Sequence, residues 1–467
     1  MRKFYWYLTA YIKKHGLVFT LSLVSAIVLF SLFLPAFVSN LEKGQRKYIG
    51  IVGEYTLDTL PSVITNRLSV GLTTIEPDGS TVPALAERWT VENDGKTYRF
   101  VLKQNLFWND GKPLEPSDLQ YAFKDVETIL TPNDIVFKLP DAYAPFPTLV
   151  SQPVFRTVSE PRFWFFTRQN KVGLGENKIT NYSTQGTKLK QITIDGPDTR
   201  HIYRFYLTEE DAVTAFKMGE IDAIPDLQRK HDIFQWPTVS VTPTLHTDRY
   251  LAVFFNIRNS QFQKNIRQGL AYALDKPASD VRALGPISVD SWAYLESIKS
   301  YDKDPDRAVE RLMDPIPGKP LQFELTTTTL FAAQAEAIKT QWEAIGDKAV
   351  TTCQSDSKVE NKADCGNLDI AVQVRIASFP DVSSFEVLLV GQESPSDPDQ
   401  YALWHSEQST NFTGYKNIRI DNLLEKGRQS FNQQERTETY QEFQQFFLED
   451  SPAIFMKYLE TYAIERM

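Results

Sequence analysis

Cysteine and histidine are scarce in this chain of 467 residues, which contains two cysteines and five histidines. The histidines form no H-E-x-x-H pair, and the cysteines have no further ligands at the spacing of a zinc site. The chain also lacks G-x-S-x-G, the turn that exposes a hydrolase serine. Gly173-Leu174-Gly175 lacks the third glycine of a dinucleotide-binding turn. We therefore expect that the protein is not an enzyme and has no catalytic residue, no metal and no cofactor.

An excess of basic residues is missing as well, since the formal net charge is −9. Residues 1–39 contain four lysines and arginines and no acidic residue, so the rest of the chain is more acidic still. An acidic surface repels the phosphates of nucleic acids, and we expect no nucleic-acid partner. The same charge favours cationic or zwitterionic ligands.

Charged residues are absent from residues 17–38, a run of about 22 residues that is long enough to span a bilayer as a helix. Basic residues precede the run, so the positive-inside rule places residues 1–16 in the cytoplasm and the main body outside. We expect a single-pass anchor in the cell membrane, a linker at 39–47, and an extracytoplasmic body. A cleaved signal peptide is the alternative, although the apolar run is longer than usual and is followed by a poor cleavage site.

Both cysteines, Cys353 and Cys365, lie in the predicted extracytoplasmic part. They flank a polar loop between two strand-like runs, a geometry compatible with a disulfide that closes the base of the loop. Two free thiols are the alternative.

The segment 82–123 contains the clearest local pattern in the chain. Apolar residues alternate with polar ones around Trp89 and again over 98–102, with Asn93-Asp94-Gly95 between them, which predicts a β-hairpin. A second turn follows at Asp110-Gly111, and Ser117 is placed to cap a helix that continues through Phe123.

Later segments predict alternating strands and helices. A strand at 323–327, a helix at 332–345 closed by Gly346, and a strand at 368–374 form a strand–helix–strand unit, which is typical of a parallel α/β layer. A buried strand is predicted at 251–256, and Asn432 with Glu435 predicts the start of a helix that ends near residue 449.

Six segments resemble, in order, the motifs of family 5 extracellular solute-binding proteins, the oligopeptide and dipeptide receptors of bacterial ABC importers. They are 82–123, A-F-K-M-G-E-I-D-A-I at 215–224, L-A-V-F-F-N and its following helix at 251–276, S-D-P-D-Q-Y-A-L-W-H-S at 396–406, 417–424, and 451–455. The resemblance covers about residues 48–465, which is nearly all of the predicted extracytoplasmic part.

This resemblance implies an α/β, two-lobed, periplasmic-binding-protein-like fold of type II, in the large peptide-receptor subclass. Lobe I is expected at 48–250, lobe II at 251–452, and a return to lobe I at 453–467. It implies that the lobes close on a peptide at a hinge and deliver it to ABC permease and ATPase subunits. The alternatives are a receptor for another small solute (an oligosaccharide or a metal complex) or a degenerate scaffold or signalling receptor.

The resemblance also suggests ligand-binding residues. Glu393 is the acid nearest to the position that holds a peptide's α-amino group in peptide-binding relatives. The other candidates lie in 397–411 or in the loop after the first strand: Asp397, Asp399, Tyr401, Trp404, Asn411 and Tyr55. For Asp397 and Asp399 the alternative is that they cap the helix carrying Tyr401 and Trp404, and for Asn411 it is a plain turn residue. His405 remains either a metal-contact residue or a hydrogen-bonded histidine.

Overall fold

The computed structural model describes residues 14–16, 20–27, 30, 46–163, 166–277 and 281–467. These residues belong to two compact units, Met1–Thr59 with Glu176–Ala223, and Leu60–Gly175 with Ile224–Met467. The predicted lobe boundaries remain a prediction. The two units are defined by compactness in one conformation, and this does not show where the hinge between the lobes lies. Most of the predicted anchor at 17–38 lies outside the described residues. Within the described part of the chain, no helix is both long enough and apolar enough to cross a membrane.

The first unit contains four neighbouring strands of a larger sheet, in the order β10-β11-β12-β1. β1 runs parallel to β12, and the other neighbours are antiparallel. The elements of this unit are β1 (Arg46–Val52), β10 (Lys178–Gln185), β11 (Lys188–Asp195), β12 (Arg200–Tyr206) and α4 (Glu209–Lys217). The Thr208 hydroxyl accepts a hydrogen bond from Asp211 N at 3.1 Å and caps α4. Gly219, at φ +78°, follows the end of this helix.

The first part of the second unit, residues 60–175, contains a four-stranded sheet with the order β4-β5-β7-β6. Its elements are α2 (Ser62–Leu68), β2 (Thr73–Ile75), β3 (Thr81–Pro83), β4 (Ala86–Glu92), β5 (Thr97–Leu102), β6 (Glu127–Leu130), β7 (Asp134–Lys138), α3 (Phe146–Leu149), β8 (Arg156–Phe163) and β9 (Phe166–Val172). The predicted hairpin is confirmed. Asn93, Asp94 and Gly95 connect β4 to β5 with φ values of +53°, +51° and +86°.

The predicted helix from Ser117 to Phe123 is wrong. A single 3₁₀ turn, η1 (Pro116–Asp118), stands in its place. Asp118 accepts hydrogen bonds there from Trp108 Nε1 at 2.9 Å and from Glu115 N at 3.1 Å. The chain then turns Tyr121 and Phe123 inward against Phe137, with ring centroids 5.8 and 6.0 Å away. Burial of these two rings therefore outweighed the local helix signal.

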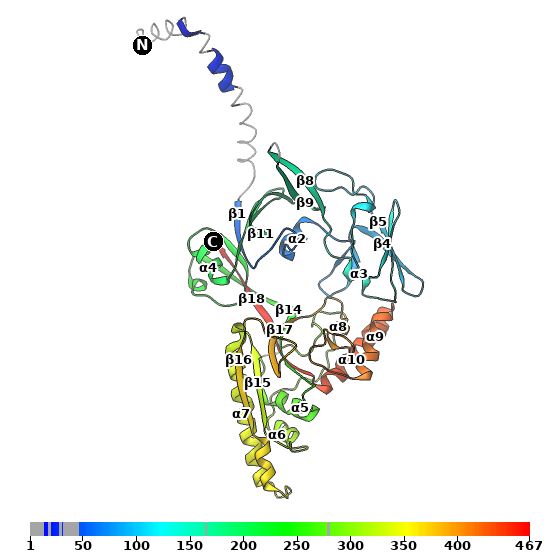
Figure 1. The fold of residues 1–467 in the computed structure, drawn as a ribbon, viewed down its shortest axis with the longest axis vertical. Helices are drawn as coiled ribbons and strands as arrows, with labels where there is room; N and C mark the ends of the chain where they lie inside the picture. The colour runs from blue at the N-terminus through cyan, green and yellow to red at the C-terminus, as the bar shows by residue number, and fades with distance from the viewer. Residues whose placement is uncertain (1–13, 17–19, 28–29, 31–45, 164–165, 278–280) are drawn as a thin grey trace. The chain divides into compact units, whose positions relative to one another are not determined.

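The rest of the second unit contains five neighbouring strands of a larger sheet, in the order β18-β14-β17-β15-β16. β15 is parallel to both β16 and β17, as the predicted strand–helix–strand unit requires. In Figure 1 the long helix α7 runs beside β15 and β16. The elements are β14 (Val239–Phe255), α5 (Lys264–Ala273), α6 (Pro305–Leu312), β15 (Leu321–Thr327), α7 (Ala332–Ser355), β16 (Ile370–Ile376), β17 (Val387–Glu393), α8 (Tyr401–Trp404), α9 (Ile418–Gln429), α10 (Gln433–Asp450) and β18 (Ala453–Arg466).

Strand β14 divides two hydrophobic cores. Leu251, Val253 and Phe255 belong to one core, which also contains Trp342, and Phe254 belongs to the other. Successive side chains point to opposite faces of a strand, so a continuous apolar run is expected where both faces are covered. The predicted buried strand at 251–256 is confirmed and is the end of the much longer β14.

Helix α7 is longer than predicted, because it continues through Gly346 to Ser355. A Cβ atom on Gly346 would lie 2.8 Å from the backbone nitrogen of Ile370 in β16. This glycine therefore permits close helix–sheet packing and does not end the helix. Cys353 consequently lies on the last turn of α7 rather than beside a strand.

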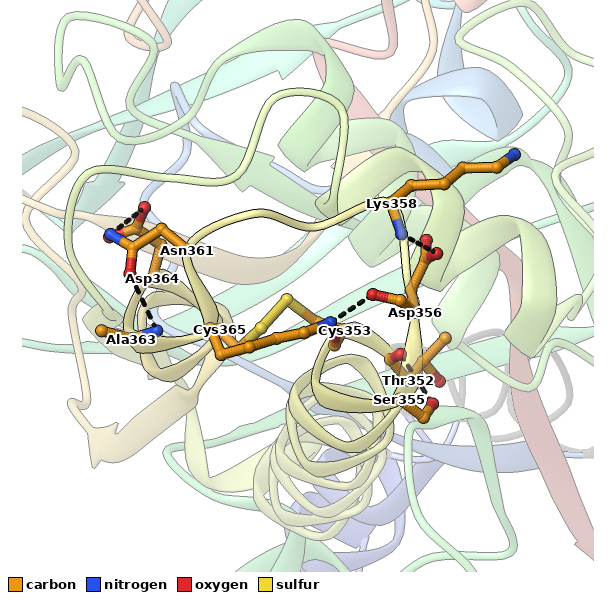
Figure 2. Close-up of a disulfide and its surroundings, with 10 residues drawn as sticks. Thr352, Cys353, Ser355, Asp356, Lys358, Asn361, Ala363, Asp364 and Cys365 are labelled. Atoms are coloured by element: carbon orange, nitrogen blue, oxygen red, sulfur yellow. Dashed lines mark hydrogen bonds between the residues drawn. A yellow bond between two sulfur atoms is a disulfide. The ribbon is translucent and has the colours of Figure 1, made fainter.

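The predicted disulfide is confirmed. It joins Cys353 to Cys365 in the 3₁₀ turn η4 (Lys362–Leu368), with Cα atoms 5.6 Å apart. Figure 2 shows the bond closing the loop between the end of α7 and η4. Both cysteines are fully buried, so the bond also fills part of the core under the helix.

Removal of this disulfide is expected to lower the free energy of unfolding. The sequence separation of the two cysteines is 12, and closing a loop of that size stabilises by about 3 kcal/mol through the entropy of the unfolded chain. Urea titrations of the wild type and of Cys353→Ser/Cys365→Ser measure the difference. Dithiothreitol should destabilise only the wild type. A difference below about 0.5 kcal/mol would show that the bond contributes nothing to stability.

Candidate functional site

A cavity of about 230 Å³ lies within the second unit. One wall comes from the β2–β3 hairpin, the β4–β5 hairpin and the segment 144–148, and the other comes from Trp292, the segment after β17, and the start of α10. Half of its fourteen lining residues are aromatic or hydroxyl-bearing, and one is acidic and one basic: Gly79, Ser80, Thr81, Trp89, Val91, Tyr98, Ala144, Pro147, Thr148, Trp292, Asp397, Phe431, Gln433 and Arg436. The walls belong to segments that the sequence assigns to lobe I and lobe II.

The two walls contact each other directly. Trp292 N donates to Asp78 O at 3.0 Å, and Ala144 N donates to the Arg428 carbonyl at 2.6 Å. Gly79 makes a further close approach, at φ +82°, where a side chain would collide with the Ser396 carbonyl. These contacts hold the two walls together.

Asp397 and Arg436 form a buried ion pair at the cavity wall. Arg436 Nη2 donates to both carboxylate oxygens of Asp397, at 2.7 and 3.0 Å, and Nε donates to the Gly427 carbonyl at 2.9 Å. Burial opposes the charge of Arg436, but Asp397 more than offsets this, so the pKa of the guanidinium is raised. Asp397 also accepts from Asp399 N at 3.1 Å, which forms a local turn before α8, whose N-cap residue is Gln400.

Asp399 forms a second ion pair behind the cavity wall. Its Oδ2 lies 3.0 Å from Arg428 Nε, and its Oδ1 accepts from Tyr401 N at 3.0 Å. The Arg428 guanidinium lies over the rings of Tyr143 and Tyr401, at 4.7 and 4.1 Å from their centroids. Burial raises the pKa of Asp399 to about 6, although the charge of Arg428 opposes the shift.

The raised pKa predicts that the protein loses stability as the pH rises. The pKa of Asp399 is about 6 in the folded protein and 3.8 in a free side chain, so the folded state binds the proton more tightly. The stabilisation is full below about pH 4, and it is lost as the pH rises through about 6. It amounts to about 3 kcal/mol. Urea titrations from pH 4 to 7 should show this slope in the wild type.

The slope should be absent in Asp399→Asn, which does not titrate. Asp141→Asn is the matched control, because the Asp141 side chain is 88% exposed. An unchanged slope in Asp399→Asn would assign the pH dependence to other groups.

The other predicted residues do not line the cavity. Trp404 is completely buried in the core, with its ring 4.5 Å from that of Phe447. The Asn411 amide is saturated within its own turn: Nδ2 donates to the carbonyls of His405 and Tyr415, and Oδ1 accepts from Thr413 and Gly414. In this conformation both side chains are structural.

Glu393 and Tyr55 are not lining residues of this cavity either. Glu393 is exposed at the end of β17, opposite Arg249. Tyr55 belongs to the first unit, where its hydroxyl donates to the Val52 carbonyl at 3.3 Å and its ring lies 5.4 Å from Phe205. Of the seven predicted residues, the structure brings Asp397, Asp399 and Tyr401 together, and Asp397 alone lines the cavity. Ligand contact by these seven residues stays a prediction.

His405 is a buried, hydrogen-bonded histidine. Its Nδ1 accepts from Glu407 N at 3.2 Å, so Nε2 carries the proton and donates to Glu425 Oε1 at 3.2 Å. Its ring stacks on Tyr401 at 4.1 Å. Across the described residues, no group of three or more acidic, histidine or cysteine side chains is placed to hold a metal ion.

Sequence reasoning missed most of the cavity wall. The hairpin pattern identifies Trp89 and Tyr98 only as part of its apolar face, and the sequence motifs contain neither Trp292 nor Phe431. The available signal was that Trp292 and Phe431 are single aromatic residues flanked by serine, S-W-A and S-F-N, where a core residue is not expected. Arg436 gave no signal, because its partner Asp397 is 39 residues earlier in the sequence.

The architecture is a two-lobed, periplasmic-binding-protein-like fold. A family model described as "Bacterial extracellular solute-binding proteins, family 5 Middle" matches residues 80–132 and 128–396. The match spans more than half of the chain, and the chain belongs to this family. The family consists of solute receptors and is not a family of enzymes, and the resemblance found in the sequence is confirmed.

Known relatives are distant in sequence and similar in fold. The oligopeptide-binding protein AppA of Bacillus subtilis is 23% identical over 238 residues, which are 45% of this chain and 41% of that relative. The match therefore spans less than half the length of the curated relative.

Two solved structures have the same fold over most of their length. NikZ from Campylobacter jejuni, in complex with Ni(L-His), is 21% identical, with coverage of 91% of this chain and 94% of that chain and a TM-score of 0.67. CtaP from Listeria monocytogenes is 19% identical, with the same coverages and a TM-score of 0.69.

Proposed function

We propose that this chain is the extracytoplasmic substrate-binding subunit of an ABC importer, of type II and the large peptide-receptor subclass. Two lobes close on a peptide, and the closed form delivers it to the permease and ATPase subunits. Family membership supports the receptor role. The observation that carries the proposal is the cavity lined by segments assigned to both lobes, since ligands of such receptors are removed from water by closure.

Peptides are the favoured ligands. AppA of Bacillus subtilis is named for oligopeptide binding, and its structure in complex with a nonapeptide covers 91% of this chain with a TM-score of 0.63. The mixture of aromatic rings, hydroxyls and a neutralised ion pair in the cavity suits a peptide, whose backbone is polar and uncharged.

Residues 17–38 are proposed to anchor the receptor in the membrane, with residues 1–16 in the cytoplasm. The length of the uncharged run and the preceding basic residues support this orientation. The disulfide supports an oxidising location for the body of the protein, since such bonds persist outside the cytoplasm. Anchoring keeps the receptor concentrated beside its permease.

Mass spectrometry of molecules that co-purify with the full chain in detergent tests the ligand class directly. Peptides are expected, and a peptide added at 100 times its Kd should stabilise the protein by about 2.7 kcal/mol in a thermal-shift assay. If only an oligosaccharide or a metal complex stabilises the protein, that solute and not a peptide is the ligand of this receptor. No stabilisation by any solute would indicate a scaffold or signalling receptor, and cleaved peptides would indicate an enzyme.

A further inference from the structure

The cavity is small, and four of its fourteen lining residues are aromatic. Trp89 and Tyr98 from the β4–β5 hairpin form one side, and Trp292 and Phe431 form the other. The volume of about 230 Å³ is below the roughly 300–1,000 Å³ of pockets that enclose a whole drug-sized ligand. The space therefore suits one side chain of a longer guest, and the rest of that guest has to lie outside the cavity.

The charges at the cavity wall neutralise each other. Asp397 and Arg436 are the charged residues of the lining, and they are bound to each other at 2.7 Å. Both oxygens of Asp397 already accept hydrogen bonds from Arg436, and one also accepts from Asp399 N. A guest with its own charge would lose water without gaining a free counter-charge, which is unfavourable.

The Arg436 guanidinium is also fixed in place. It lies over the rings of Trp292 and Tyr440, at 5.1 and 5.5 Å from their centroids. Turning it toward an anionic guest would break these contacts and the pair with Asp397. With its charges paired, the lining offers a guest aromatic rings and the hydroxyls of Ser80, Thr81 and Thr148. Rings pack well against rings in offset or edge-to-face arrangements, so the rings favour an aromatic side chain.

We propose that this cavity is a specificity pocket for one uncharged, large apolar side chain of the bound peptide, with an aromatic ring favoured over an aliphatic chain. The proposal rests on the proposed peptide-binding function and adds the class of residue that the receptor selects. Phe431 is the main determinant of the pocket among the rings that can be removed without damage to the core. Its side chain is 42% exposed, and its ring covers Gly95.

The test uses the full chain in detergent and a set of penta-alanine peptides in which one position is replaced in turn by Trp, Phe, Leu, Lys or Glu. Isothermal titration calorimetry measures each Kd. At one position, Trp and Phe should bind about 10- to 100-fold more tightly than Ala, Leu should be intermediate, and Lys and Glu should gain nothing.

Phe431→Ala should reduce the preference for the ring by about 10-fold and should change the Kd for penta-alanine by less than about 2-fold. Phe379→Ala is the matched control, because Phe379 is 94% exposed and does not line the cavity. Val91→Trp, which places a ring inside the cavity from the partly exposed strand β4, should abolish the preference.

Equal affinity for all side chains, or a preference for Lys or Glu, would overturn this inference and leave the peptide-binding function intact. A preference that survives both Phe431→Ala and Val91→Trp would place the pocket elsewhere and overturn it too. If no peptide binds while another solute does, the proposed ligand class fails, and this inference fails with it.

Discussion

Arg436→Met is expected to lower the free energy of unfolding by about 3–5 kcal/mol. The substitution keeps most of the side-chain volume but leaves the Asp397 carboxylate buried without its partner, since that side chain is 11% exposed. It also leaves the Gly427 carbonyl without the hydrogen bond from Arg436 Nε. Urea titration followed by far-UV circular dichroism gives the loss.

Two comparisons isolate the unpaired charge as the cause. Asp397→Asn combined with Arg436→Met should cost less than the sum of the single changes, because no charge remains buried. Arg375→Met should cost less than about 1 kcal/mol, because Arg375 pairs with Glu324 at 3.2 Å on the surface, with 58% of its side chain exposed. Similar losses for Arg375→Met and Arg436→Met would refute the explanation.

Trp342→Ala is expected to lower the free energy of unfolding by about 3–5 kcal/mol as well. Trp342 is a completely buried residue of α7. Its ring lies 5.5 Å from that of Phe323, and its Nε1 donates to the Leu270 carbonyl at 2.9 Å. The substitution opens a large cavity in the core that joins α5, α7 and β15, and it leaves a buried carbonyl without a partner.

Trp342→Phe should cost less, about 1–3 kcal/mol, because most of the ring is kept and the hydrogen bond is lost. Trp236→Ala is the surface comparison, since Trp236 is 38% exposed. A loss in Trp342→Ala no larger than in Trp236→Ala would mean that this core does not hold the unit together.

Local patterns predicted the elements whose own residues decide their conformation. Asn93-Asp94-Gly95 connects β4 to β5, because these residues adopt positive φ at low cost. Leu251 to Phe255 forms a strand with both faces buried, because its apolar residues suit no exposed face. Asn432 caps α10 as predicted, by accepting from Glu435 N at 3.0 Å.

Local patterns were insufficient where a distant segment decided the outcome. The run from Ser117 to Phe123 has a helix signal, but Phe137 and Phe146 in other elements draw its rings into the core. Gly346 resembles a helix end in the sequence. The structure shows it inside α7, where the close approach of β16 leaves no room for a side chain. Trp404 resembles a ligand contact in the sequence because its burial depends on Phe447, which the motif does not contain.

The sequence by itself determined the family, many of the strands and helices, and the absence of known catalytic motifs, because each depends on residue types at fixed spacings. For Cys353 and Cys365 it left a disulfide and two free thiols open, and the tertiary structure decided for the disulfide. Tertiary structure alone decided the composition of the cavity and the pairing of Asp397 with Arg436. The physical reason is that a cavity consists of the surfaces left between elements far apart in the chain, and packing, not local propensity, determines which side chains face it.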